Sequence, residues 1–216
     1  MTRPTSSDGT HAAAPYGLRM PPDLPPYAAV VLAGGRAARM GGQAKPQLSV
    51  GGRSILVAVL DAVADAAPRL VVGPEQPVPA GVRLLREQPP GGGPVAALRA
   101  GLGPVDTEVV AVLAGDLPFV PARLVTELRQ QLADDGVLVV DGAGRDQYLL
   151  GVWRTAVLRA AVADVAGPAS LRRVLAPLTV RRMRPDVRAG EPPPWTDCDT
   201  PADLARARLL AGPGPE

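Results

Sequence analysis

The 216-residue sequence has one cysteine, one histidine, few aromatic residues and little net charge. The lone Cys198 excludes an internal disulfide and gives no indication of a zinc site. Aromatic residues make up 3% of the chain, too few for a base-stacking platform, and a net charge of +2 from scattered basic residues gives no reason to expect nucleic acid. No apolar run approaches the roughly 20 residues of a membrane span. We therefore expect a cytoplasmic protein that binds neither nucleic acid nor membrane.

The length suits one ordinary domain with a sizeable core. Residues 1–26 are rich in proline and small polar residues, and they cannot bury enough apolar surface to offset the entropy of ordering. We predict a disordered tail over 1–26, a single domain over 27–211 and a frayed tail over 212–216.

The most informative stretch runs from Tyr27 to Leu48. A short apolar run ends at Gly34 and Gly35, which is typical of a buried strand followed by a loop. Glycines after a strand let backbone N–H groups approach an anion, and basic side chains follow in the same segment. This pattern indicates a site for a ligand that carries several phosphates.

Lys45 ends this segment and is the only lysine in the chain, in which every other basic residue except His11 is an arginine. An ammonium is a compact point charge, whereas a guanidinium is a wide planar fork, so a tight phosphate pocket would select lysine. The alternative is a solvated lysine kept by chance, and the neighbouring glycines favour the phosphate site.

Short apolar runs alternate with helical patterns along the rest of the chain, which predicts an α/β fold with a mostly parallel sheet. Strands are expected near residues 28–32, 70–72, 82–85, 108–113, 137–140, 147–153 and 178–183, with a hairpin over 137–153. Helices are expected over 54–66, 95–102, 121–132, 154–165 and 170–176 and from 201. The helix starts carry capping residues at Ser54, Ser170 and Thr200.

Two groups of carboxylates follow the pattern of a ligand site. Asp116 comes just after the apolar strand at 108–113, where ligands bind in open α/β sheets, so it is well placed to hold a metal ion. Asp197 and Asp199 precede the last helix and offer a second metal contact. The alternative for each is a turn or helix-capping aspartate.

Two other classes of phosphate-binding loop do not fit the residues. A nicotinamide or flavin oxidoreductase needs G-x-G-x-x-G with an acidic residue about 20 positions later, and the spacing from Gly34 to Gly41 differs. A Walker A loop needs lysine directly after glycine, whereas two residues separate Gly42 from Lys45.

Five segments in order resemble the nucleotidyltransferases that attach a nucleotide to molybdopterin. They are LAGGRAARMGGQAKP (32–46), GGGPVAALRAGL (91–102), AGDLPFVP (114–121), GRDQYLLGVWR (144–154) and DCDTPADL (197–204). The resemblance covers about residues 27–210. It implies a three-layer α/β/α sandwich with a mostly parallel, Rossmann-like nucleotidyltransferase sheet.

The resemblance also implies the roles of individual residues. Leu32, Ala33, Gly34 and Gly35 would wrap the nucleotide, Lys45 and Arg39 would offset phosphate charge, and Asp116 would hold Mg²⁺ and touch the nucleotide. Three positions depart from the family pattern. Glu87 replaces an aspartate that contacts base or ribose, Gly73 replaces an asparagine, and Asp199 stands where members that transfer GMP often have asparagine. Asp199 would then be a second ligand of Mg²⁺, as in related cytidylyltransferases.

The implied reaction is transfer of GMP from GTP to the terminal phosphate of molybdopterin, with release of pyrophosphate. GPVAAL favours the guanylyl reaction, whereas DCDTPADL is closer to the cytidylyltransferases. A cytidylyl or nucleotide-sugar transferase is therefore the first alternative. A non-catalytic nucleotide-binding relative is the second, although it would be expected to lack Lys45 or Asp116. We expect a monomer or weak oligomer, with a cofactor-accepting enzyme or chaperone as a further partner.

Overall fold

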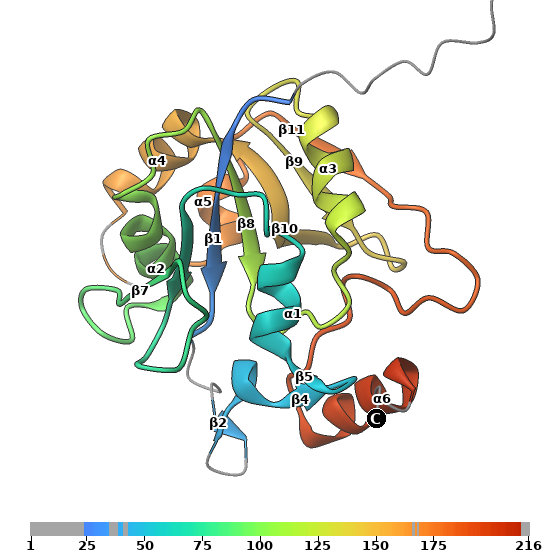
Figure 1. Ribbon diagram of the computed structural model, residues 1–216. Helices are drawn as coiled ribbons and strands as arrows, with labels where there is room; N and C mark the ends of the chain where they lie inside the picture. The colour runs from blue at the N-terminus through green and yellow to red at the C-terminus, as the bar shows by residue number, and fades with distance from the viewer. Residues whose placement is uncertain (1–23, 35–38, 41–42, 166, 168, 213–216) are drawn as a thin grey trace, which may run out of the picture.

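The computed structural model describes residues 24–34, 39–40, 43–165, 167 and 169–212. Its centre is a seven-stranded sheet in the order β11-β9-β10-β8-β1-β6-β7 (Figure 1). The strands are β1 (Tyr27–Leu32), β6 (Arg69–Val72), β7 (Val82–Leu85), β8 (Val109–Ala114), β9 (Gly136–Val140), β10 (Asp146–Arg154) and β11 (Val180–Met183). Only β10 of these runs antiparallel to its neighbours, which confirms the mostly parallel sheet and the predicted hairpin.

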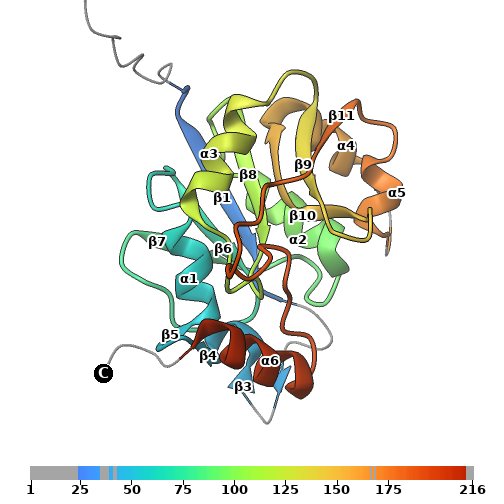
Figure 2. The same ribbon diagram turned by 90° about the vertical axis from the view of Figure 1, so that its right-hand side faces the viewer.

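Helices cover both faces of the sheet and bury its apolar side chains in two clusters. One cluster joins the sheet to α1 (Ile55–Asp61), α3 (Ala122–Gln130) and α6 (Pro201–Ala211). The other joins it to α2 (Gly93–Leu102), α4 (Thr155–Ala163) and α5 (Leu171–Leu175). The predicted three-layer α/β/α sandwich is confirmed. Figure 2 shows α6 below α1, beside the short strands β4 (Ser49–Val50) and β5 (Arg53–Ser54) that come just before α1 in the sequence.

Helix starts follow the capping chemistry in the sequence. The hydroxyls of Ser54 and Ser170 accept backbone N–H groups of the first turns of α1 and α5, and Thr200 forms a capping box with Asp203. Helix ends are predicted less well. The helix expected to reach Ala66 ends at Asp61, because the chain continues in tighter turns until Ala67 donates its N–H to the carbonyl of Tyr27.

The sequence pattern did not predict the short elements between β1 and α1. They are two small hairpins, β2 (Arg39–Met40) with β3 (Gln43–Ala44) and β4 (Ser49–Val50) with β5 (Arg53–Ser54), and the 3₁₀ turn η1 (Lys45–Gln47). Gly51 and Gly52 make the tight turn between β4 and β5 with φ of 60° and 84°. The sequence predicts this turn, but strands of two residues are too short to show a period.

Trp153 fills the core between β10 and α4, with no exposed surface. Two glycines make room for its ring. A Cβ on Gly136 would lie 2.3 Å from Cε3 of Trp153, and one on Gly151 would lie 3.1 Å from its Nε1. Trp153 and Gly136 therefore fit together, whereas a Cβ on Gly151 would first meet the carbonyl oxygen of Val137, at 2.7 Å.

No helix in the described part of the chain is both long and apolar enough to cross a membrane.

Candidate active site

The carboxyl ends of three parallel strands lie level with one another. Leu32 pairs with Val72 of β6 on one side and with Ala114 of β8 on the other. Ala33, Gly73 and Gly115 therefore leave the sheet side by side, at the edge where open α/β sheets bind ligands. The sequence placed Asp116 at this edge, and the register confirms that position.

The backbones at this edge touch directly. Ala33 donates its N–H to the carbonyl of Val72 at 2.8 Å, and Gly115 donates to the carbonyl of Leu32 at 2.9 Å. A Cβ on Gly73 would lie 2.7 Å from the oxygen of Ala33, and one on Gly115 would lie 2.9 Å from the Cβ of Ala33. Since real Cβ atoms do not approach so closely, both positions require glycine in this arrangement.

A cavity of about 570 Å³ opens beside this edge, against the start of α2. Its volume is in the range of small-molecule sites. Leu32, Gly34 and Glu87, all predicted to bind nucleotide, line it together with Pro74 and the glycine-rich segment before α2. The Glu87 carboxylate accepts the N–H of Gly91 at 2.9 Å, so it also holds that segment in place.

Lys45 lies in η1 and its side chain is only 7% exposed. Its Nζ donates to Oδ1 of Asp199, 2.9 Å away, and the Asp199 side chain is 62% exposed. A buried ammonium needs a partner, and the residue before α6 supplies it. The fold thus joins the end of the glycine-rich segment to the terminal motif, a pairing that the sequence did not predict.

Asp116 faces two further carboxylates. Its burial, followed by the charges of Asp199 and Asp197, raises the pKa of Asp116 to about 6, while Lys45 acts in the opposite direction. The pKa of Asp197 is also raised, by burial and by Asp199. The three carboxylates therefore lie within electrostatic reach of one another, and each disfavours the charged form of Asp116 or Asp197.

The donor chemistry fits the predicted Mg²⁺. Magnesium is usually held by one or two carboxylates together with substrate phosphates and waters, and Asp116 and Asp199 provide such a pair. Within the described ranges no group of three or more histidine, cysteine, aspartate or glutamate side chains could hold a metal by itself. The site therefore fits a magnesium ion that is shared with a nucleotide.

Cys198 lies between the two aspartates of the terminal motif and is fully buried. Burial, with added repulsion from Asp116 and Asp197, raises the pKa of its thiol to about 11. The thiol therefore stays protonated at neutral pH and serves as a core residue rather than as a nucleophile.

Two predicted site residues are wholly or partly outside what the structure describes. Gly35 lies outside the described residues, and Arg39 is described only through its backbone, in β2. In contrast, no pattern in the sequence pointed to Gln76, whose buried side chain contacts Ala33 at the site edge. It lies among prolines in the loop after β6, a composition that predicts only an irregular segment.

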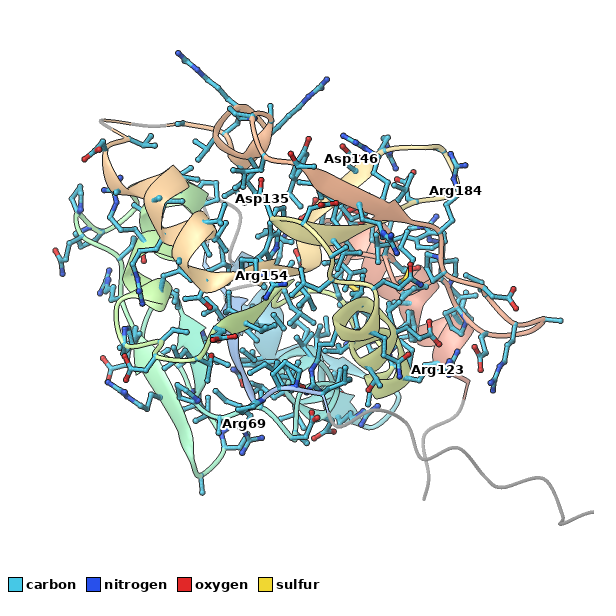
Figure 3. The ribbon with its side chains drawn as sticks, turned by 90° about the horizontal axis from the view of Figure 1, so that it is seen from above. Arg69, Arg123, Asp135, Asp146, Arg154 and Arg184 are labelled. Atoms are coloured by element: carbon cyan, nitrogen blue, oxygen red, sulfur yellow. The ribbon has the colours of Figure 1, made fainter. Side chains whose placement is uncertain are left out.

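The opposite end of the sheet has a second cavity, of about 700 Å³. Figure 3 looks onto this end, where Asp135 and Arg154 lie near each other at the ends of β9 and β10. Arg154 donates its N–H to the carbonyl of Asp135 at 2.9 Å. The residues that line this cavity include none of the predicted site residues.

Asp116 follows the carboxyl end of β8, and the buried Lys45 of η1 lies near enough to lower its pKa. Residues 29–184 match the family model of the MobA-like NTP transferase domain. A relative from Rhodopseudomonas palustris (strain BisB5), named molybdenum cofactor guanylyltransferase, is 32% identical over 207 residues, which are 88% of this chain and 96% of that relative. The chain belongs to the MobA-like NTP transferase family and is a nucleotidyltransferase.

Solved structures with lower identity share the fold. Molybdopterin-guanine dinucleotide biosynthesis protein A from Archaeoglobus fulgidus has a TM-score of 0.61 at 18% identity, covering 85% of this chain and 97% of that one. The 2-C-methyl-D-erythritol 4-phosphate cytidylyltransferase from Thermus thermophilus has a TM-score of 0.62 at 22% identity, covering 86% and 98%. The same sheet thus occurs in proteins named for guanine and for cytidine nucleotides.

Proposed function

We propose that this chain transfers GMP from GTP to the terminal phosphate of molybdopterin, releases pyrophosphate and requires Mg²⁺. The observation that carries the proposal is the ion pair of Lys45 with Asp199, within electrostatic reach of Asp116, together with the cavity lined by Leu32, Gly34 and Glu87. The name of the Rhodopseudomonas relative supports the choice of guanine and molybdopterin.

The reaction exchanges one phosphorus–oxygen bond for another. An oxygen of the acceptor phosphate attacks the α-phosphorus of GTP, and the bond from that phosphorus to the oxygen bridging the α- and β-phosphates breaks. A phosphate monoester has a second pKa of about 6, so the attacking oxygen is already anionic at neutral pH. The site therefore needs no general base, in keeping with a sequence whose only histidine is His11.

The remaining problem is the approach of two polyanions. Lys45 would place its ammonium against the nucleotide phosphates and exchange part of its contact with Asp199 for them. Asp116 and Asp199 would hold the magnesium ion, which when bound supplies positive charge to the phosphate oxygens. The tight contacts of Gly73 and Gly115 with Ala33 keep this edge free of side chains that would exclude the phosphates.

Calorimetry with the purified protein tests the proposal. We expect GTP to bind in the presence of Mg²⁺ more tightly than CTP, ATP or NAD, and we expect EDTA or Asp116→Ala to abolish that binding. Pyrophosphate release on addition of molybdopterin would then establish the transfer. Failure of every triphosphate to bind, with and without the acceptor, would overturn the proposal and support the non-catalytic alternative.

A cytidylyltransferase is the second candidate, because Asp199 supplies a carboxylate where members that transfer GMP often have asparagine. Tighter binding of CTP than of GTP in the same titration would select it and would leave the roles of Lys45 and Asp116 unchanged.

The domain limits, a monomeric or weakly oligomeric state, and a cofactor-accepting enzyme or chaperone as a partner stay predictions.

A further inference from the structure

Gln76 is one of the few buried polar residues of the described chain, with 8% of its surface exposed. It lies in the loop between β6 and β7, close behind Gly73. Its carboxamide lies against the close contact between Ala33 and Gly73, since a Cβ on Gly73 would be 3.2 Å from Nε2 of Gln76. A buried amide is retained where its hydrogen bonds are made, so its partners indicate its role.

The hydrogen-bond partners of Gln76 include residues at both ends of the segment from Ala33 to Gln47. Its Nε2 donates to the carbonyl of Ala33 at 3.4 Å and to that of Pro74 at 3.3 Å. Its Oε1 accepts from Nε2 of Gln47 at 3.1 Å, and the same nitrogen of Gln47 donates to the carbonyl of Pro77. Two carbonyls on one side and an amide donor on the other fix which end of the carboxamide is nitrogen.

These contacts connect the exit of β1 to the turn that carries Lys45. Ala33 is the residue at which the chain leaves β1, and Gln47 is the last residue of η1, which begins at Lys45. The glycine-rich segment between them starts and ends at groups that bond to one side chain. Holding both ends at a fixed separation positions the Ala33–Gly34 backbone and the Lys45 ammonium relative to each other.

We infer that Gln76 is a positioning residue for the nucleotide phosphates, acting as a clasp between Ala33 and Gln47. The inference rests on the proposed function, because it takes Ala33 and Lys45 as nucleotide contacts. Gln76 lies behind the contact of Ala33 with Gly73, so it acts through these residues. Binding is tighter when a site is held in its bound geometry before the ligand arrives.

Two substitutions separate the clasp from simple filling of space. Gln76→Leu keeps the bulk and removes both donor and acceptor. Gln76→Glu keeps the length and the acceptor for Gln47 but sets a carboxylate against the carbonyls of Ala33 and Pro74. We expect GTP to bind about tenfold more weakly to either variant, since each leaves buried polar groups unpaired. The matched control is Gln130→Leu, at an exposed position of α3.

Gln47 provides a second route to the same contact and lies nearer the surface, so its variants are expected to fold even if Gln76→Leu does not. We expect Gln47→Leu to weaken GTP binding by a smaller factor. If the clasp is one unit, the double variant should bind GTP no more weakly than Gln76→Leu alone. In steady state KM for GTP should rise, with kcat at saturating GTP almost unchanged.

Hydrogen exchange measured without nucleotide tests whether Gln76 holds Ala33 and Gln47 in place, whatever the protein binds. We expect Gln76→Leu and Gln76→Glu to speed exchange at the amides of Ala33 and Leu48, with protection of β9 and α4 unchanged. Unchanged exchange at these amides, or GTP affinity within about twofold of wild type in both variants, would overturn the inference. A wild-type protein that binds no nucleotide would instead refute the proposed function, and the exchange result would still stand.

Discussion

The two sides of the site edge are held by different chemistry. On the side of β1, β6 and α2, glycine backbones touch directly and the amide of Gln76 bonds to carbonyls. On the side of β9, β10 and β11, carboxylates hold the turns. Asp141 accepts from the N–H groups of Ala143 and Arg145, from Nε of Arg145 and from Nε2 of Gln147, at 2.7 to 3.0 Å.

The chemistry of the nucleotide side suits the ligand proposed for it. Carboxylates beside a polyphosphate would repel it unless a cation were present, so neutral backbone and amide groups suit the nucleotide side. The β9–β10–β11 side is rich in arginine, and two of these side chains pair with carboxylates, Arg145 with Asp141 and Arg182 with Asp146. Figure 3 labels Asp146 and Arg184 on the side of β9, β10 and β11. Both Nε and Nη2 of Arg182 donate to the carboxylate of Asp146, at 2.9 to 3.2 Å. Backbone and amide contacts thus predominate around Ala33, whereas carboxylate contacts predominate at the turn between β9 and β10.

The largest effect on turnover is expected from substitutions of Lys45 and Asp116. We expect Lys45→Ala and Asp116→Ala each to lower turnover by about 10²- to 10³-fold, because under the proposed function Lys45 would contact the transferring phosphate and Asp116 would hold the Mg²⁺ that does so. Pyrophosphate release at saturating GTP measures this loss, and circular dichroism checks that the variants fold.

The matched control for Lys45 is Lys45→Arg, which keeps the charge but replaces a compact ammonium with a wide fork. We expect this variant to recover only part of the lost turnover. Near-wild-type turnover in Lys45→Ala or in Asp116→Ala would remove that residue from the proposed reaction.

A smaller effect is expected from adding one methyl group on the nucleotide side. Gly73→Ala would push a Cβ against the Ala33 carbonyl, and we expect a loss of about 1–3 kcal/mol in the free energy of unfolding, with weaker GTP binding. Gly142→Ala is the control on the other side, because its Cβ would meet only Trp195, at 3.8 Å. Urea unfolding of both variants measures the contrast, and equal stabilities would contradict it.

The carboxylate side should respond to acid through Asp141. Hydrogen bonds, first from the backbone N–H of Arg145, lower the pKa of Asp141. A lowered pKa adds stability above the unfolded value of about 3.9, and that stability is lost as pH falls toward the folded value. We therefore expect wild type to exceed Asp141→Asn in unfolding free energy at pH 6, and we expect the difference to begin shrinking at about pH 4 and to be lost as pH falls further, through the folded pKa.

At neutral pH, Asp141→Asn also tests whether the β9–β10–β11 side acts independently of the nucleotide side. Asp141 lies at the end of β9, separated from the cavity at β1 by β10 and β8. We expect GTP to bind Asp141→Asn within about twofold of wild type, since distant sites act independently. A larger loss of GTP affinity would show that the two sides are coupled.

The smallest effect is expected at Arg182. Its side chain is 60% exposed, so its pair with Asp146 is screened by water. We expect Arg182→Ala to lower the free energy of unfolding by less than about 1 kcal/mol and to leave GTP affinity unchanged. Unfolding in urea and the GTP titration together measure both quantities, and a loss above about 2 kcal/mol would contradict the screening argument.

The sequence predicted the local elements of the fold well, because local chemistry decides them. Ser54, Ser170 and Thr200 cap the helices that they were expected to cap, and Pro94 lies in the first turn of α2. Asp116 lies at the strand end where the apolar run before it placed it. Patterns of capping and periodicity depend on near neighbours, so a single sequence contains them.

Contacts between distant segments were not predictable in the same way. Nothing in the sequence joins Lys45 to Asp199, because their pairing depends on how α6 lies beside η1. The bonds of Gln76 to Ala33 and Gln47 depend likewise on the register of β6 with β1. Roles assigned through the family resemblance reached Asp199 but not Gln76, because no matched motif contains the loop after β6.

The fit of Trp153 between Gly136 and Gly151 has a consequence for comparing relatives. The ring excludes even a methyl group at Gly136, whereas a Cβ at Gly151 would meet the carbonyl oxygen of Val137 first, at 2.7 Å, so Trp153 and Gly136 are the two positions expected to vary together in evolution. A relative with a smaller aromatic or aliphatic residue at the position of Trp153 should therefore tolerate alanine or a larger residue at the position of Gly136. Such linked changes would report the packing of β9 against β10 from sequences alone.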